Sequence, residues 1–344
     1  MTDIKSFTLE QLIQYCEERG WEKYRAYQIF VWLYQKNATN FDKMTNLSKQ
    51  LRHELNQQFY ISHLIPIRTV ASPDSTVKLT LALEDNNVIE SVFLFDGNRR
   101  TACVSSQVGC PLNCRICATA RLGFKRNLKW YEIVEQVQAL TRATGITPTN
   151  IVFMGMGEPL LNLDEVIEAV KVMNSNYGLK IAARRITIST AGIPEGIHRL
   201  AEFPLQVRLA VSLNASNDQT RTMIMPINQR YPLNTLLEAI RKYYAQTHRR
   251  ITFEYVILAG VNNLQADIFR LTQLLKDIPC KINLIPFNPF PGATFQPPLP
   301  TAVKKFAQAL YPHLPTVTIR KSKGRKILAG CGQLASQSHF SKIT

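Results

Sequence analysis

Strand-like and helical segments alternate along the last two thirds of this chain, and this alternation restricts the folds open to it. From Trp130 onward, amphipathic helical segments separate six apolar segments with strand character, which span residues 150–154, 185–189, 206–213, 251–258, 280–286 and 316–320. Repeated β-α units of this spacing form a parallel sheet, because each helix carries the chain back across the sheet. We therefore predict an α/β fold with a partial (β/α)6 barrel, and a doubly wound open sheet is the alternative.

The first third of the chain has a different pattern. Apolar residues recur at helical spacing up to about residue 70. Two strand patterns follow, and the turn residues Asp96-Gly97-Asn98 end the second one. The expected organisation is a helical accessory domain over 1–75, a short β extension over 76–105, and the barrel with a C-terminal catalytic loop over 106–344.

The chain carries a large excess of positive charge. Its 41 Lys and Arg residues against 25 Asp and Glu residues give a formal net charge of +16. Such a field attracts polyanions, and nucleic acid and anionic membranes are the main candidates. The sequence has neither the roughly 18 uninterrupted apolar residues of a membrane span nor the layout of a signal peptide. We therefore expect a cytoplasmic protein that contacts nucleic acid and no membrane.

Three of the seven cysteines lie within eight positions. Cys110, Cys114 and Cys117 form a C-x3-C-x2-C pattern, which in a cytosolic chain favours metal or catalytic chemistry over disulfides. A 4Fe–4S cluster normally has four thiolate ligands, so three would leave one iron open to a substrate. A structural zinc site is the alternative, but it needs four protein ligands, and the nearest downstream histidines are His198 and His248. The pattern therefore predicts an iron–sulfur cluster.

Polar residues and glycines follow several of the expected strands. Gly157 and Glu158 come just after the strand at 150–154, and Ser189, Ser212 and Asn288 also lie at strand ends. In β/α barrels, the loops at the C-terminal ends of the strands carry the chemistry. Taken alone, these residues could equally be tight turns and caps.

The cysteine pattern, with Phe124 and the basic pair Lys125-Arg126 after it, resembles the signature of radical S-adenosylmethionine (SAM) enzymes. The resemblance implies a radical SAM barrel that holds one 4Fe–4S cluster on Cys110, Cys114 and Cys117. It also implies a SAM site in which Glu158 holds the methionine amino group. The remaining SAM contacts that it implies are Gly157, Ser189, Ser212, Leu213, Asn214 and Asn288.

Further segments resemble one radical SAM family along nearly the whole chain. They are Arg25–Tyr34, Asp42–Leu47, Cys103–Cys110, Ile251–Val256, Lys281–Asn288 and Ala329–Leu334. The family is the bacterial adenine carbon-2 methyltransferases of 23S ribosomal RNA and certain tRNAs (RlmN), whose close relative methylates carbon 8 (Cfr). The resemblance implies methylation of adenosine carbon 2 in 23S ribosomal RNA, with tRNA as a second substrate. Carbon-8 methylation and a non-catalytic RNA-binding protein with a structural metal site remain the alternatives.

The same resemblance implies a mechanism with two SAM molecules per turnover. One SAM methylates Cys331, and the second is cleaved to a radical that activates this methyl group for addition to adenine. Glu90 accepts the proton from the adenine carbon. Cys103 then releases the RNA by forming a transient disulfide with Cys331. The resemblance also implies an electron donor such as flavodoxin or ferredoxin, and we expect a monomer.

The chain departs from the family pattern at two places. Asn214 stands where the family usually has histidine, and Arg325 and Lys326 stand where acidic residues are common before the catalytic cysteine. These two residues, with Arg320, Lys321 and Lys323, form a basic run that could contact RNA phosphates. We expect the two remaining cysteines, Cys16 and Cys280, to be packing residues.

Overall fold

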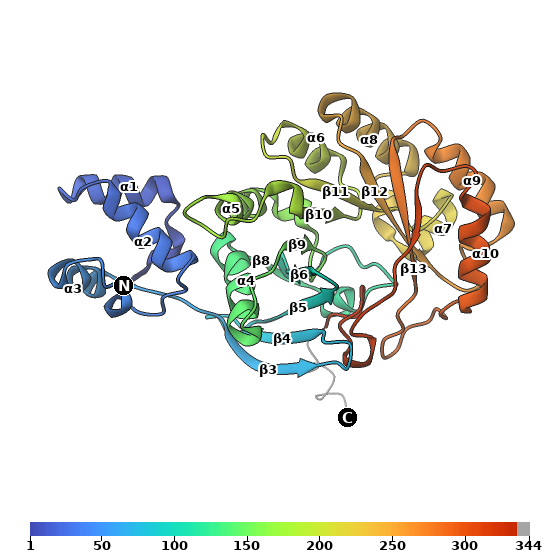
Figure 1. Cartoon of the computed structure of the whole chain (residues 1–344). Coiled ribbons are helices and arrows are strands. Elements are labelled where there is room, and N and C mark those ends of the chain that lie inside the picture. The colour runs from blue at the N-terminus through green and yellow to red at the C-terminus, as the bar shows by residue number, and fades with distance from the viewer. Residues whose placement is uncertain (336–344) are drawn as a thin grey trace.

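The computed structural model describes residues 1–335 and contains one ten-stranded sheet (Figure 1). All six expected strands are present, and they pair in parallel with one another in chain order, which confirms the predicted α/β fold with a parallel sheet. They are β9 (Asn150–Phe153), β10 (Ile186–Thr190), β11 (Arg208–Ser212), β12 (Ile251–Ile257), β13 (Cys280–Pro286) and β14 (Val317–Ile319).

The strands before the barrel belong to the same sheet. The order continues from β9 through β6 (Arg99–Cys103), β5 (Val88–Asp96) and β4 (Val77–Ala82) to β3 (Ile65–Ala71). β6 pairs antiparallel with β5 but parallel with β9. The expected β extension is therefore joined to the barrel without a break, and β6 adds a seventh parallel strand.

The expectation of helical structure up to about residue 70 is wrong for β3. This strand lies at the sheet edge, pairs antiparallel with β4, and has an irregularity between Pro66 and Arg68. Its side chains are largely exposed, including Ile65 and Ile67. An exposed edge strand lacks the alternation of buried apolar and exposed polar residues by which a strand is recognised in a sequence. Proline is tolerated in such a strand because its missing N–H costs no hydrogen bond between strands.

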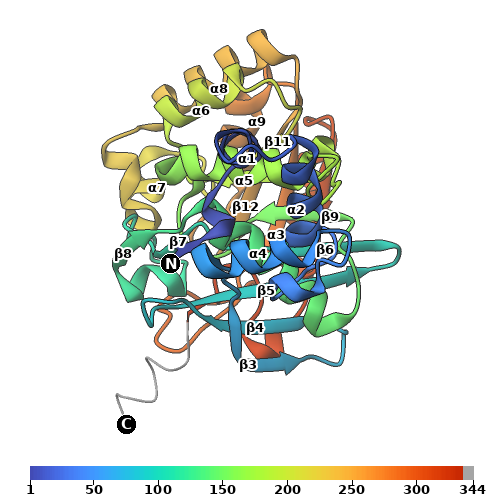
Figure 2. The same cartoon turned by 90° about the vertical axis from the view of Figure 1, so that its left-hand side faces the viewer.

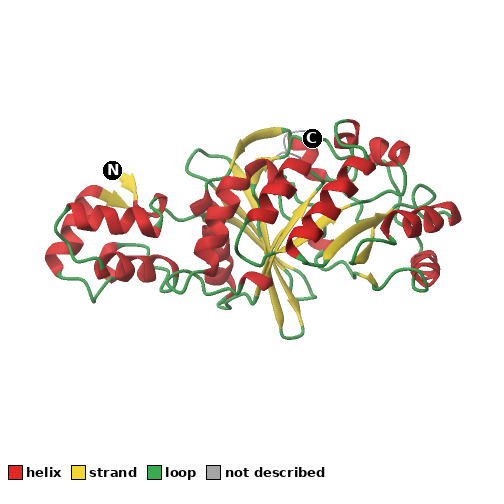
Figure 3. Ribbon diagram, turned by 90° about the horizontal axis from the view of Figure 1, so that it is seen from above, coloured by secondary structure: helices red, strands yellow, loops and turns green. Residues whose placement is uncertain are grey.

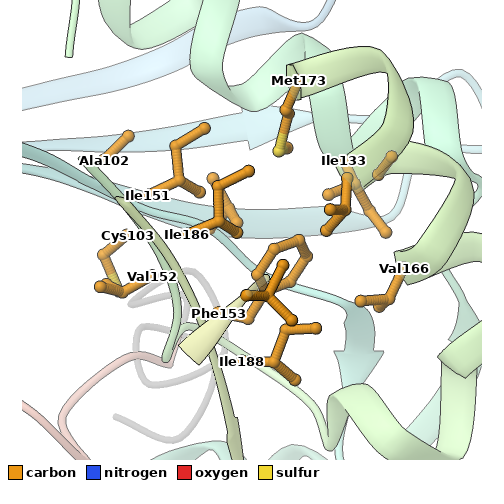
Figure 4. Packing of buried hydrophobic residues seen from close by; sticks show 14 of the residues in the cluster. Ala102, Cys103, Ile133, Ile151, Val152, Phe153, Val166, Met173, Ile186 and Ile188 are labelled. Atoms are coloured by element: carbon orange, nitrogen blue, oxygen red, sulfur yellow. The ribbon is translucent and has the colours of Figure 1, made fainter. Parts of the chain in front are cut away.

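Helices cover the outer face of the parallel strands (Figures 1 and 3). Side chains alternate along each strand, so Ile151 and Phe153 pack toward this helix layer, whereas Cys103 and Val152 lie on the inner face (Figure 4). Cys280 is buried in the same core. The helices are α4 (Trp130–Thr144), α5 (Leu163–Asn174), α6 (Pro194–Glu202), α7 (Asp218–Ile224), α8 (Leu233–Thr247), α9 (Gln265–Leu275) and α10 (Pro300–Leu310).

The N-terminal module lies against α4 (Figures 1 and 2). The buried Lys5 side chain forms an ion pair with Glu135 of α4, and Arg142 contacts the same carboxylate at 2.5 Å. Cys16 is fully buried within the module. Within residues 1–335, no helix has the length and apolar character needed to cross a bilayer. The module contains β1 (Thr2–Asp3), α1 (Leu9–Glu18), α2 (Tyr24–Tyr34), α3 (Lys49–Gln58) and β2 (Phe59–Tyr60).

Candidate active site

A cavity opens at the C-terminal ends of the parallel strands. It encloses about 980 Å³ of space between its walls, including the open solvent at its mouth. Most of the residues predicted for the cluster and for SAM come together on its wall, although they are far apart in sequence. Those that line it are Cys110, Cys114, Cys117, Gly157, Glu158, Ser189, Ser212, Asn214, Asn288 and Cys331.

The cysteine loop is fixed at both of its ends. It begins after β7 (Gln107–Gly109), which pairs antiparallel with β8 (Phe124–Asn127). Gly109 has a φ of +74°, and a Cβ there would lie 1.7 Å from the carbonyl oxygen of Gly123, so only glycine fits. The N–H of Ala118 donates to the carbonyl of Gly332 at 2.7 Å, which joins the loop to the segment carrying Cys331.

The three thiols share one buried environment. Burial raises the pKa of Cys110 to about 12 and that of Cys114 well above its ordinary value, and the neighbouring cysteines add to both effects. Burial also raises the pKa of Cys117. Such thiols become thiolates only beside a strong positive charge, and an iron–sulfur cluster would supply it.

Glu158 lies at the turn after β9. Its two carboxylate oxygens accept the N–H groups of Leu160 at 3.0 Å and Ala191 at 2.7 Å. Burial nevertheless raises the pKa of Glu158 to about 7, so a ligand cation would stabilise its charged form. The preceding Gly157 has a φ of +97°, and a Cβ there would lie 2.5 Å from the Cβ of Gln107. The turn therefore requires glycine to present this carboxylate.

Two residues of the cavity wall carry a buried oxygen without a hydrogen-bond partner in the described part of the chain. They are Asn288, through Oδ1, and Glu254, through Oε2. Asn288 also donates from Nδ2 to the carbonyl of Cys331 at 3.1 Å. A buried acceptor without a donor is costly, so a ligand rich in N–H and O–H groups, as SAM is, fits this wall.

Two of the predicted SAM contacts also have structural roles. Asn214 has a φ of +58°, and its Oδ1 accepts the N–H of Val256 at 2.8 Å, which ties the end of β11 to β12. Leu213 is fully buried in the apolar core and does not line the cavity. Its carbonyl accepts the guanidinium of Arg221 at 3.1 Å.

Arg221 is a site residue that the sequence did not reveal. It is fully buried, and its guanidinium also donates to the carbonyls of Ala191 at 2.5 Å and Ser212 at 3.3 Å. It thereby joins the loops that follow β10 and β11. A single arginine in a helix has no local signature that would identify this role.

The two predicted catalytic cysteines lie near one arginine. Cys331 lines the cavity, whereas Cys103 is buried on the inner face of β6. Burial raises the pKa of Cys103 to about 12, Cys331 adds to the rise, and Arg320 opposes it. Arg320 lines the cavity wall instead of lying wholly on the surface, whereas Lys321, Arg325 and Lys326 of the same basic run are exposed.

Glu90 does not line the cavity. It is 1% exposed and forms an ion pair with Lys78, with 3.1 Å between Oε1 and Nζ. Burial raises the pKa of Glu90, and Lys78 opposes the rise.

Comparisons with known proteins agree with this arrangement. Residues 2–61 match the family described as "Ribosomal RNA large subunit methyltransferase N-terminal domain", and residues 104–272 match the radical SAM superfamily. A crystal structure of a radical SAM methyltransferase from Sphaerobacter thermophilus superposes with a TM-score of 0.92 at 42% identity, covering 97% of this chain and 99% of that one.

Two curated relatives are similar over nearly their full length. The proteins from Pelobacter propionicus and Geobacter sulfurreducens, each named "Dual-specificity RNA methyltransferase RlmN", are both 47% identical to this chain. The alignments cover 97% of this chain in both cases, and 95% and 92% of the respective relatives. The chain therefore belongs to the RlmN family of radical SAM RNA methyltransferases.

Proposed function

We propose that this enzyme methylates carbon 2 of an adenosine in 23S ribosomal RNA and in tRNA, through a methyl group carried on Cys331. The observation that carries the proposal is the position of Cys331. It lies on the wall of the same cavity as the three cluster cysteines, and it is near enough to the second thiol, Cys103, to raise the pKa of that thiol. The names of the relatives, which describe dual-specificity RNA methyltransferases, support an RNA substrate of two kinds.

The chain would hold its cofactors through the residues of the cavity wall. Cys110, Cys114 and Cys117 would bind one 4Fe–4S cluster, which together with two SAM molecules per turnover supplies methyl transfer and radical chemistry. The carboxylate of Glu158 would receive the ammonium group of SAM. The free Oδ1 of Asn288 would accept a hydrogen bond from the same ligand. Ser189, Ser212 and Asn214 would complete the binding wall.

Two thiols and one carboxylate would then act on the RNA base. Radical addition leaves one unpaired electron on the base, and this electron would return to the redox centre that supplied the electron for SAM cleavage. Glu90 accepts the proton that leaves adenine carbon 2. The Cys103 thiolate attacks Sγ of Cys331, a sulfur–sulfur bond forms, and the bond between Sγ and the transferred carbon breaks. The electron pair of that bond passes to the carbon, which gains a proton and becomes the new methyl group. A dithiol or the electron donor must afterwards reduce the disulfide. Arg320 is the cation that favours the Cys103 thiolate.

The base has to leave its stack to reach this buried site, which costs a few kcal/mol. The exposed Lys321, Arg325 and Lys326 lie on the loop that carries Cys331, where contacts with RNA phosphates would help to offset the cost. We also propose a monomer in the cytoplasm that receives electrons from a flavodoxin or a ferredoxin.

The test is anaerobic incubation of the cluster-loaded enzyme with methyl-labelled SAM and either a 23S RNA fragment or tRNA. Mass spectrometry of the nucleosides should find 2-methyladenosine with wild-type enzyme and none with Cys331→Ala, while Cys280→Ala serves as the buried-cysteine control. A product methylated at carbon 8 would overturn the assignment of the carbon. Product formation by Cys331→Ala would overturn the role of that thiol.

A further inference from the structure

The loop that carries Cys331 lies against the antiparallel strands of the sheet (Figure 1). The N–H of Gly324 donates to Oδ2 of Asp74 at 2.8 Å, at the beginning of this loop. Farther along, Nζ of Lys78 on β4 donates to the carbonyl of Leu328 at 3.3 Å. Lys78 therefore holds the loop three residues before the methyl-carrying cysteine.

The backbone at this contact is one that leucine rarely adopts. Leu328 has a φ of +53° and a ψ of +44°, which is the left-handed region. That conformation is disfavoured for a residue with a Cβ, so contacts from outside the loop are needed to keep it. The hydrogen bond from Lys78 is one such contact.

The same ammonium group contacts the predicted base. Nζ of Lys78 lies 3.1 Å from Oε1 of Glu90, and the two side chains are only 4% and 1% exposed. Removal of one partner from a buried ion pair leaves the other charge uncompensated, so the ionisation of Glu90 depends strongly on Lys78.

Other groups around Glu90 have weaker effects on its charge. Arg68 of β3 and the N–H of Ala335 also favour the charged carboxylate, but each less than Lys78 does. The backbone of Glu90 contacts uncharged groups: its N–H lies 3.3 Å from Sδ of Met156, and its carbonyl accepts the hydroxyl of Ser105 at 2.7 Å. Lys78 therefore does most to lower the pKa of Glu90 against the effect of its burial.

We propose that Lys78 is a positioning residue that keeps the Glu90 carboxylate charged and joins it to the loop that carries Cys331. One ammonium group then sets the protonation of the base and fixes that base beside the loop of the methyl-carrying thiol. Cys331 itself is also held by the hydrogen bond from Nδ2 of Asn288 to its carbonyl, so its own methylation does not depend on Lys78. Lys78 takes no part in the bonds that form or break, since the proton from adenine carbon 2 passes to Glu90. The inference rests on the proposed function, because it needs Glu90 to act as the base.

The experiment compares Lys78→Met, Lys78→Arg, Glu90→Gln and the double variant Lys78→Met/Glu90→Gln in the cluster-loaded enzyme. Lys242→Met, which breaks an exposed 2.8 Å ion pair with Glu238 on α8, is the control for loss of a lysine charge. The double variant contains no uncompensated charge at this site, so it is expected to fold even where Lys78→Met is unstable.

Three measurements separate positioning from simple structural damage. Mass spectrometry before RNA is added measures methylation of Cys331. The rate of RNA methylation is then followed from pH 6 to 9. Isotope-edited infrared titration, with Glu90→Gln to identify the band, measures the ionisation of Glu90 without any turnover.

Lys78→Met should methylate Cys331 like wild type but form RNA product at least about tenfold more slowly at pH 7, with recovery at higher pH. Lys78→Arg should retain the wild-type profile. The double variant should be no slower than Glu90→Gln, because Lys78 acts through Glu90. Rate losses that multiply in the double variant, or an unchanged infrared titration of Glu90 in Lys78→Met, would overturn the inference. Failure of wild-type enzyme to methylate Cys331 would instead refute the proposed function, and the infrared titration would still test Lys78.

Discussion

The substitution Glu158→Gln tests whether this carboxylate receives the ammonium group of SAM. Burial raises the pKa of Glu158 to about 7, even though two backbone N–H groups favour its charged form. A neutral carboxyl group attracts an ammonium group only weakly. The affinity of wild-type enzyme for SAM should therefore increase as the pH rises toward 7 and Glu158 becomes charged.

The size of this effect follows from the pKa. At pH 5.5 only a few per cent of Glu158 is charged, whereas at pH 7 about half is, so the Kd for SAM should fall about tenfold or more over this interval. This range lies below the pKa of about 8 at which the amino group of SAM itself loses its proton. Glutamine removes the charge, and loss of a hydrogen bond to a charged group should weaken binding at pH 7 by about 1.5–3 kcal/mol.

Isothermal titration of the cluster-loaded enzyme with SAM, carried out anaerobically at pH 5.5, 6.2 and 7, measures both effects. Glu195→Gln on α6, where the carboxylate accepts the Tyr231 hydroxyl at 3.0 Å, is the matched control. It should keep the pH dependence of wild type. Equal affinity of wild-type enzyme across this range, together with undiminished binding by Glu158→Gln, would refute the reasoning.

Other substitutions test separate parts of the site. Cys103→Ala should leave RNA covalently attached to the protein, seen as a slowly migrating species on a denaturing gel, and free product at the normal rate would contradict the disulfide release step. Gly157→Ala places a Cβ 2.5 Å from the Cβ of Gln107 at a φ of +97°, so thermal unfolding should show a loss of about 2 kcal/mol or more. Asn214→Ala removes the acceptor for the N–H of Val256 and the residue suited to a φ of +58°, and urea unfolding should show a loss of about 2–3 kcal/mol.

The parts of the fold that could be predicted from sequence are those in which local pattern and burial agree. Five of the six barrel strands, β9 to β13, are largely buried, so each appears as a short apolar segment bounded by polar residues. The sixth, β14, lies at the sheet edge, where Thr318 and Ile319 are exposed. The direction in which a strand pairs is not encoded locally. β6 follows the turn at 96–98 and is not singled out as a strand in the sequence, and its parallel pairing with β9 depends on residues almost fifty positions away.

The residues of the candidate site also fall into those that a local sequence pattern reveals and those that it does not. Cys110, Cys114 and Cys117 were identifiable because three cluster ligands lie within eight residues. Arg221 could not be identified, because its role depends on carbonyl groups of two loops that only the folded chain brings around it. The ion pair between Lys78 and Glu90 was hidden for the same reason, since it joins adjacent strands in a register that the sequence does not specify.

The position of Cys103 makes the register of β6 important for the chemistry. Cys103 is paired with Val152, and its sulfur lies on the inner face while the neighbouring Ala102 faces the helices (Figure 4). A slip of β6 by one position against β5 and β9 would turn the sulfur into the helix layer and out of reach of Cys331. A slip of two positions would return the residue at that place to the inner face, but it would no longer be Cys103. The release step therefore depends on the register of β6 as well as on the presence of the thiol.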